Sequence, residues 1–228
     1  MTHMPISPEE FIQHYPCLYH VAEQGTWPSI RRHGLCSTTA LLDLFSINGD
    51  RRRQLESQRR PKSEQIQDAN LGTATIRDQG PMSDRALRKC LRGMTPTRWY
   101  EFLNRRVFFW VTEKRVETLL TARRYRRGEH TVITLDTASV LNSHMERITL
   151  SPINSGSTLY NPQPRGRNTF LPLHRYPFAE RRKKRGILNA VAELAINHAM
   201  MDVLDHTIRV EHRRGPRIVE VIYERPPR

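Results

Sequence analysis

One carboxylate stands alone in an apolar segment near the end of the chain. Glu193 lies within residues 191–196, where its neighbours are valine, alanine, leucine and isoleucine. Burying a charged group has a high free-energy cost unless the group is paired or neutralised. Glu193 is therefore a candidate catalytic residue, and the alternative is a buried salt bridge to an arginine.

A histidine near the N-terminus precedes a predicted tight turn. His20 lies in the apolar segment 17–21, which is typical of a strand, and Gly34 follows residues 26–33, which are typical of a helix. A glycine at the end of a helix permits a turn that brings backbone N–H and C=O groups close to a flat amide ligand. The alternative for His20 is a half-buried strand residue that is hydrogen-bonded to the backbone.

An aromatic run followed by basic residues is a third feature with chemical potential. Phe108, Phe109 and Trp110 lie in a short strand-like segment, and Lys114 and Arg115 come after it. Aromatic faces attract cationic rings, and a guanidinium group can bind a pyrophosphate. The alternative is that the three aromatic side chains belong to the hydrophobic core.

Two polar islands, at residues 77–79 and 154–156, complete the candidates. The first contains Arg77 and Asp78, and the second contains Asn154. Both islands are rich in residues that form ordinary turns, so they predict either a binding site or turn structure alone.

Several classes of enzyme are excluded by missing motifs. The sequence contains no G-x-x-x-x-G-K-[ST], no G-x-G-x-x-G after a strand, no H-E-x-x-H and no G-x-S-x-G. We therefore do not expect a phosphate-loop nucleotide hydrolase, a zinc protease or a serine hydrolase. The histidines show no metal-ligand spacing, and the three cysteines form no C-x-x-C pair, so we expect no metal and a reducing, cytoplasmic environment.

The charge of the chain favours a polyanionic partner. Lysine and arginine total 37 against 23 acidic residues, which gives a formal net charge of +14. Such a charge attracts nucleic acid through counterion release. Arginine-rich segments at 51–60, 123–127 and 181–185 could contact its phosphates. The residues expected at these contacts lie in the last two runs and are Arg123, Arg124, Arg126, Arg127, Arg181, Arg182 and Lys183. The alternative is that both runs are solvated surface. No apolar run approaches the roughly 18–20 residues of a membrane span, so we expect no membrane partner.

The elements that would position these residues favour an α+β fold in one domain spanning residues 1–228. Short helical patterns come first, and strand patterns dominate the second half of the chain. Residues 46–98 form a polar insertion that we expect to be exposed and helical in places, with capped helices at 83–90 and 95–103. Further predicted elements are a helix at 118–125 and strands at 106–111, 130–135, 148–150, 187–196, 206–211 and 217–224.

Taken in order, these segments resemble the ADP-ribosyltransferase superfamily. Members often begin with a Leu-Tyr-His-x strand and a helix that ends in Ile-x-x-x-Gly-Leu, as at residues 18–21 and 30–35 here. The strand at 107–111 with the basic residues after it, and the strand around Glu193, are similar to those of DarT-type enzymes. The whole chain also resembles a bacterial family of uncharacterised proteins.

The resemblance implies a split β-sheet core with N-terminal helices and a site that cleaves the nicotinamide–ribose bond of NAD⁺. Glu193 would stabilise the developing positive charge, His20 would orient the riboses, and Arg115 or Lys114 would contact the pyrophosphate. Further residues implied to bind NAD⁺ are Tyr19, Val21, Ser29, Gly34, Leu35, Arg77, Phe108, Phe109, Trp110 and Asn154.

The acceptor implied by the resemblance and the charge is a nucleic acid, RNA or DNA. A toxin or phage-defence effector, with an antitoxin or immunity protein as partner, fits such an activity. One alternative is a basic nucleic-acid-binding protein that keeps the fold without catalysis. Another is an enzyme of unrelated chemistry, such as a nuclease that uses Arg77, Asp78 and Asn154.

Overall fold

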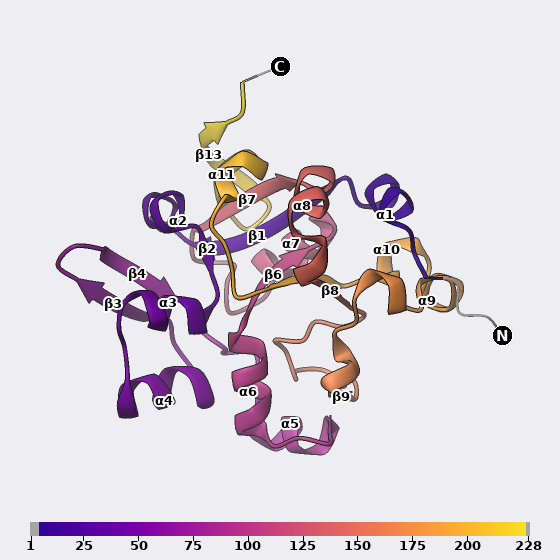
Figure 1. Ribbon diagram of the computed structural model, residues 1–228, viewed down its shortest axis with the longest axis horizontal. Helices are drawn as coiled ribbons and strands as arrows, with labels where there is room; N and C mark the ends of the chain where they lie inside the picture. The colour runs from indigo at the N-terminus through magenta and orange to yellow at the C-terminus, as the bar shows by residue number, and fades with distance from the viewer. Residues whose placement is uncertain (1–4, 227–228) are drawn as a thin grey trace.

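The computed structural model, which describes residues 5–226, is built around an antiparallel sheet of seven strands in the order β13-β12-β7-β1-β6-β10-β8 (Figure 1). The α+β class is as predicted. The strands are β1 (Cys17–Glu23), β6 (Arg106–Trp110), β7 (His130–Asp136), β8 (Ile148–Ser151), β10 (Glu193–Asn197), β12 (Thr207–Arg214) and β13 (Arg217–Glu224).

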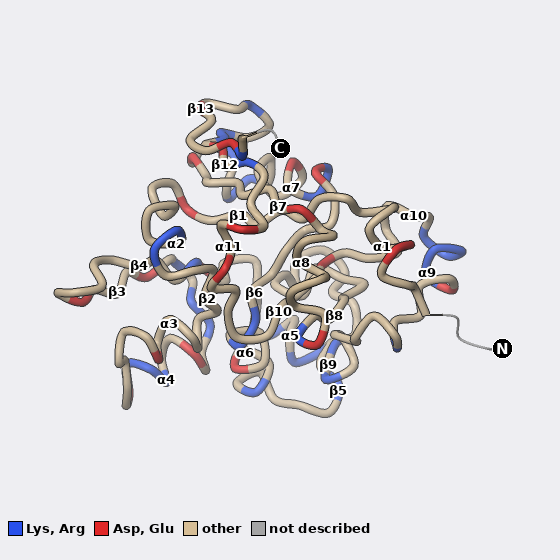
Figure 2. The backbone as a smooth tube through the Cα atoms, turned by 45° about the horizontal axis from the view of Figure 1, so that its top comes forward, with Lys and Arg blue, Asp and Glu red and all other residues tan. Residues whose placement is uncertain are grey.

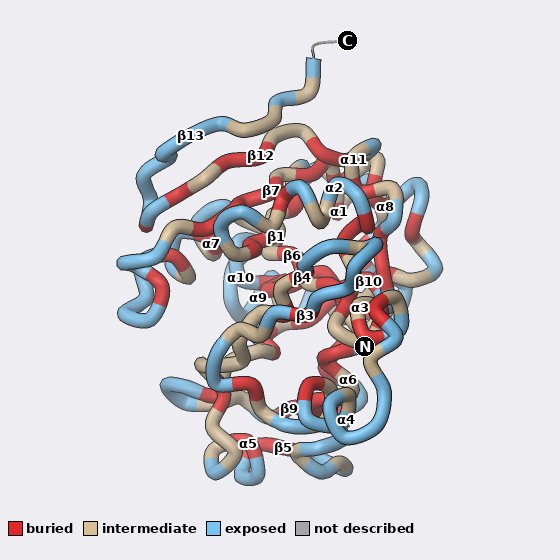
Figure 3. Tube along the Cα trace, turned by 90° about the vertical axis from the view of Figure 1, so that its left-hand side faces the viewer, coloured by how far each residue is buried: buried red, intermediate tan, exposed pale blue. Residues whose placement is uncertain are grey.

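Helices cover both faces of this sheet. On one face, α1 (Pro8–His14) and α8 (Thr137–His144) bury Phe11, Val140 and Leu141 against the strands. On the other face, α7 (Glu113–Thr121) packs Val116 and Leu120 against strand residues of β1 and β7. The central strands are therefore buried, whereas β13 is exposed along most of its length (Figure 3).

The sheet is almost interrupted between β1 and β6. Strand β1 pairs with β7 along its whole length, from Cys17 to Glu23, but it pairs with β6 only at Tyr19 and Trp110. Beyond that bridge a side chain replaces the ladder, because His20 Nδ1 lies 2.9 Å from the carbonyl oxygen of Phe108. The two strands diverge there and leave room for a ligand.

The segment 46–98 is helical in places, as predicted, but it also contains strands that the sequence did not predict. After α4 (Gly49–Ser57) it forms a hairpin of β3 (Glu64–Asp68) and β4 (Gly72–Ile76), whose turn is held by Asp68 Oδ1 accepting from Asn70 N and Leu71 N. The insertion also has buried apolar residues. Its small cluster joins it to the helix α3 (Thr38–Leu44) through Leu42, Phe45, Leu55, Ile66, Ala74 and Ile76.

Some of the other predicted helix and strand boundaries are confirmed and others are wrong. The helices α5 (Asp84–Cys90) and α6 (Pro96–Asn104) begin at the predicted caps, where the Ser83 and Thr95 hydroxyls accept backbone N–H bonds. The helix predicted at 118–125 is wrong in position, because α7 ends at Thr121 and turns follow it. The strand predicted at 187–196 is partly wrong, because α10 (Ile187–Ala190) occupies its first residues.

The remaining elements are short. They are α2 (Trp27–His33), β2 (Leu35–Cys36), β5 (Leu91–Arg92), β9 (Arg165–Gly166), α9 (Phe178–Arg185), β11 (Ala199–Met200), α11 (Val203–His206) and three 3₁₀ turns at Met145–Arg147, Arg167–Thr169 and Leu173–Arg175. Among residues 5–226, no helix has the length and apolar character that a bilayer crossing requires.

Gly34, which ends α2, cannot be replaced without strain. Its φ is +75°, and a Cβ there would lie 2.6 Å from both the Met200 carbonyl oxygen and Met201 Cα. Gly34→Ala should lower the free energy of unfolding by about 2–5 kcal/mol, since left-handed strain and backbone overlap add. Gly25 has φ +79° but open space around it, so Gly25→Ala should cost only about 1–2 kcal/mol. Urea unfolding measures both, and equal losses would contradict the close approach at Gly34.

Candidate functional site

A cleft of about 310 Å³ opens where β1 and β6 diverge. Its walls come from β1, the α2–β2 turn, β6, the start of β10 and the insertion. The predicted site residues that line it are His20, Val21, Ser29, Gly34, Leu35, Arg77, Phe108, Phe109, Trp110, Asn154 and Glu193. Residues far apart in the sequence therefore meet at one opening in the sheet.

Glu193 is the buried acid of this cleft. Glu193 is 4% exposed. The backbone nitrogen of Ser155 lies 3.1 Å from Glu193 Oε1 and 3.2 Å from its Oε2, and the Ser155 N–H donates to this carboxylate. Burial raises its pKa to about 7, against the Ser155 hydrogen bonds and the positive charges of Arg115 and Arg165, which lower it. A carboxyl group with a pKa near neutrality can change its ionisation when a cationic ligand arrives.

Arg115 and Lys114, which were expected to contact the pyrophosphate and were counted with Glu193 as catalytic residues, do not line this cleft. Arg115 lines a neighbouring cleft instead, with Nη2 3.2 Å from Asn189 Oδ1, and burial lowers its pKa while the charge of Glu193 opposes that shift. Lys114 is exposed on α7 and lines neither cleft. Lys114 and Arg115 lie in the first turn of α7, which begins at Glu113, after the end of β6. Neither side chain therefore lines the opening between β1 and β6.

His20 is held neutral, with one nitrogen left as an acceptor. Because a carbonyl oxygen only accepts, Nδ1 carries the proton in its bond to Phe108. Burial lowers the pKa of His20 to about 4, so the ring is neutral at physiological pH and Nε2 is unprotonated. On a residue that lines the cleft, such a nitrogen can accept a hydrogen bond from a ligand hydroxyl.

Neighbouring residues of β1 and β6 divide between the two faces of the sheet. Tyr19 does not line the cleft; it packs beside Trp110 near α7, on the face of the sheet opposite to His20. Phe109 is 1% exposed in the main core, so its ring is not free to stack on a ligand as predicted. Phe108 and Trp110 are partly exposed and share a face with Glu193, because Trp110 pairs with Glu193 in the sheet.

The insertion contributes Arg77 directly after β4. Its Nη1 donates to the Val21 carbonyl oxygen, whereas Nη2 is buried and has no hydrogen-bond partner among residues 5–226. Burial lowers the pKa of Arg77, which still carries its charge. The adjacent Asp78 is engaged by Arg124 Nε at 2.9 Å and by the Tyr125 hydroxyl at 3.3 Å, so this acid anchors the insertion.

Some important residues were missed by sequence reasoning. Ser155 holds Glu193, although only its neighbour Asn154 was assigned to the site. Arg60 lines the cleft and is 5% exposed, with Nη2 3.0 Å from Asn104 Oδ1 and Nε 3.3 Å from the Arg77 carbonyl oxygen. The only available signal for Ser155 was the polar island. Arg60 ends the arginine-rich segment 51–60, which was considered for phosphate contacts but was not assigned to the cleft.

The two basic runs assigned to nucleic acid lie on separate elements. Arg123, Arg126 and Arg127 are exposed in the loop after α7, while Arg124 is tied to Asp78. Arg181, Arg182 and Lys183 lie on α9, where Arg182 is 3.6 Å from Glu10. Figure 2 shows basic residues spread over several elements, with α9 at one end of the molecule.

A histidine cluster outside both clefts has the residue types of a metal site. His144 and His206 place Nε2 at 3.0 and 3.1 Å from the two carboxylate oxygens of Asp202. Arg147 donates to His144 Nδ1 at 2.7 Å, so the proton of this ring is on Nε2, where a metal would need a lone pair. We interpret the cluster as a hydrogen-bond network between α8 and α11, and the expected absence of a metal stays a prediction.

The sequence model of DUF7002, a family of unknown function, matches residues 16–207. The chain belongs to this family. The matched range contains every residue that lines the two clefts and leaves most of the β12–β13 hairpin outside. No curated protein matches the chain.

The raised pKa of Glu193 gives a prediction for stability. Since the folded state binds this proton more tightly than the unfolded state, Glu193 lowers the free energy of unfolding as pH rises from about 4.5 to about 7. Glu193→Gln removes this loss, so its stability relative to wild type should increase over that range, by on the order of 3 kcal/mol. Urea unfolding at several pH values measures the difference. Glu146→Gln, at an exposed position, is the control; parallel profiles for Glu193→Gln and wild type would contradict the prediction.

Proposed function

We propose that the protein is an NAD⁺-dependent ADP-ribosyltransferase that modifies a nucleic acid. The observation that carries the proposal is the opening between β1 and β6, where neutral His20 and buried Glu193 line the same cleft. The proposed finer description of the fold is an ADP-ribosyltransferase-like split sheet, supported by the single backbone pair between those strands. The sequence resemblance supports the same assignment.

In the proposed reaction, the bond between nicotinamide and the ribose C1′ breaks and its electron pair leaves with nicotinamide. An acceptor atom then forms a bond to C1′ and loses a proton. The transition state resembles an oxocarbenium ion, so a nearby carboxylate stabilises it electrostatically. The positive nicotinamide ring favours the ionised form of Glu193, whose pKa lies near 7 without that ring.

Other residues of the cleft suit the remaining parts of NAD⁺. The unprotonated Nε2 of His20 accepts a hydrogen bond from a ribose hydroxyl. The partly exposed Trp110 and Phe108 offer aromatic faces to the nicotinamide ring. Arg77, with its unpartnered Nη2, replaces Arg115 and Lys114 as the proposed pyrophosphate contact.

The acceptor is proposed to be RNA or DNA because the formal charge of the chain is +14. A toxin or phage-defence role, with an antitoxin or immunity partner in the cytoplasm, belongs to the same proposal. The nuclease alternative is less well supported, because the Asp78 carboxylate is already occupied by Arg124 and Tyr125.

The direct test is nicotinamide release from NAD⁺ by the purified protein, alone and with RNA or DNA. Glu193→Gln should lower the rate by about 10²–10³-fold, the loss expected for one preorganised electrostatic group. The exposed Glu146→Gln serves as the matched control and should retain the rate. Full activity in Glu193→Gln would remove this residue from the mechanism. Oligonucleotide binding without nicotinamide release under any condition would favour the non-catalytic binding protein.

His20 allows a second test with paired variants. In His20→Asn the side-chain amide can still donate to Phe108 near the position of Nδ1, but the acceptor at Nε2 is lost. We expect His20→Asn to unfold at nearly the wild-type urea concentration and to raise the KM for NAD⁺ about tenfold, the effect of losing a hydrogen bond of about 1.4 kcal/mol. His20→Ala should lose stability as well. A wild-type KM in both variants would exclude a ribose contact.

A further inference from the structure

A second cleft of about 590 Å³ lies beside the first, and both are lined by Asn154. Three of the described residues that line the second cleft carry a charge, and all three are arginines: Arg115, Arg165 and Arg185. A cleft whose charged side chains are all guanidinium groups is electrostatically complementary to phosphate, which accepts paired N–H bonds from arginine. Arg185 ends the basic run that was predicted at 181–185, whereas Arg115 and Arg165 lie outside the predicted basic runs.

The three arginines of this cleft differ in how many of their N–H groups are already hydrogen-bonded. Arg165 is structural, because it donates to the carbonyl oxygens of Ser155, Ser157 and Gln163 at 2.8–3.1 Å and so fixes the loop that forms the wall. Arg115 donates from Nη2 to Asn189, and its Nη1 has no hydrogen-bond partner among the described residues. Arg185 is exposed at the end of α9, and the one hydrogen bond of its side chain within the described part of the chain is a 3.5 Å contact to the Pro152 carbonyl oxygen. Arg115 and Arg185 therefore have N–H groups available to a ligand.

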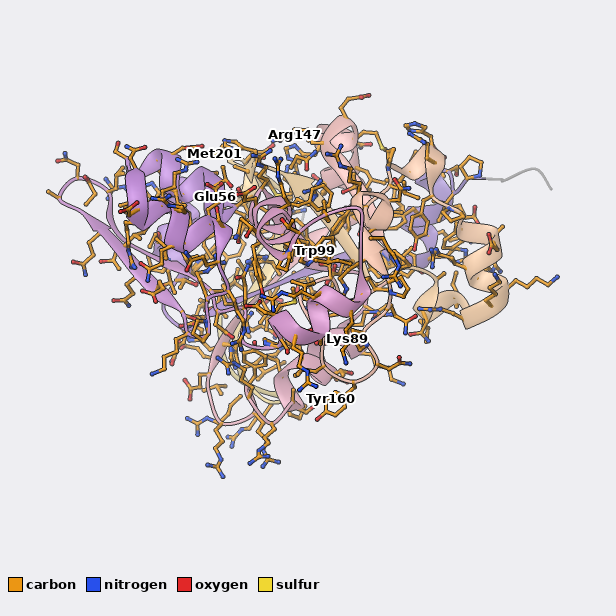
Figure 4. The ribbon with its side chains drawn as sticks, turned by 90° about the horizontal axis from the view of Figure 1, so that it is seen from below. Glu56, Lys89, Trp99, Arg147, Tyr160 and Met201 are labelled. Carbon is orange, nitrogen blue, oxygen red and sulfur yellow. The ribbon has the colours of Figure 1, made fainter. Side chains whose placement is uncertain are left out.

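An aromatic side chain stands at the rim of the same cleft. Tyr160 is 97% exposed, and the adjacent Leu159 is 49% exposed. Tyr160 also has a left-handed backbone, with φ +53°, a conformation that is unfavourable for a bulky residue. Figure 4 shows Tyr160 at the periphery of the molecule, well separated from Met201. An exposed tyrosine beside unpaired arginines is the combination on which unpaired nucleobases stack.

The wall between the two clefts is the loop that holds Glu193. The Ser155 N–H binds the Glu193 carboxylate, while the Ser155 carbonyl oxygen accepts from Arg165. A ligand in the second cleft therefore lies next to the residue that orients Glu193.

We propose that this second cleft binds a segment of single-stranded nucleic acid, with Tyr160 stacking on a base and Arg115 and Arg185 contacting phosphates. A single strand is required because the bases of a duplex are already stacked on one another. If the cleft guides an acceptor to Glu193, that role rests on the proposed function. Binding of a single strand in the cleft does not depend on the proposed function.

The test measures binding without NAD⁺, by fluorescence anisotropy of a labelled single-stranded DNA, a single-stranded RNA and the matching DNA duplex. Tyr160→Ala should weaken binding of at least one single strand about tenfold, within the range for loss of one stacked base. Arg185→Gln should reduce the slope of log K against log salt by about 0.7, the contribution of one phosphate contact to a single strand. Met201→Ala, at another exposed apolar residue, and Arg217→Gln, on β13, are the matched controls and should bind as wild type.

The outcomes separate the inference from the proposed function. Unchanged single-strand affinity in Tyr160→Ala, or equal losses in the controls, would overturn the inference even if NAD⁺ is cleaved. Tighter binding of the duplex than of either single strand would also overturn it. The expected losses in a protein that releases no nicotinamide would support the cleft and reject the transferase. Preference for DNA or for RNA would identify the polymer.

Discussion

The single backbone pair between β1 and β6 is the constraint on which the cleft depends. A continuous ladder between these strands would close the sheet and leave no opening in its middle. The hydrogen bond from His20 to Phe108 satisfies a carbonyl group that the missing ladder leaves free, and it fixes the protonation of the ring at the same time. The break in the sheet and the chemistry of His20 therefore have one physical cause.

Around this opening, burial sets the ionisation of the polar groups. Desolvation pushes the pKa of Glu193 up and that of His20 down, so both groups are biased toward their neutral forms. For Glu193, the Ser155 N–H and the charges of Arg115 and Arg165 offset part of this effect. Arg115 thus acts on the carboxyl group through space, from a neighbouring cleft, although it was assigned to the pyrophosphate.

Some residues of the candidate site and some helix boundaries could be predicted from the sequence, and others could not. His20, Gly34 and Glu193 were recognisable because each interrupts a local pattern: a histidine or an acid in an apolar strand, or a glycine after a helix. The caps of α5 and α6 were visible for the same reason. These features depend on a few adjacent residues.

The features that were missed depend on tertiary packing. The β3–β4 hairpin buries only a few side chains, so its strands carry almost no alternating pattern. The helix α10 has four residues and is too short to show a period. Arg60 is buried by contacts with Asn104 and the Arg77 carbonyl group, which lie far away in the sequence. A charged run of this kind looks the same whether it faces solvent or a cleft.

The insertion has a consequence for how the site assembles. Its own small apolar cluster and hairpin are local structures, while its links to the sheet include Arg77 to Val21 and Asp78 to Arg124. Such a unit can open as a cooperative subdomain at a lower free energy than the whole chain. Detachment of the insertion would remove one wall of the cleft while the seven-stranded sheet stays folded. Ligand affinity and global stability are thus separable properties. Amide exchange in β3 and β4 would measure the opening of the insertion, on which ligand affinity depends.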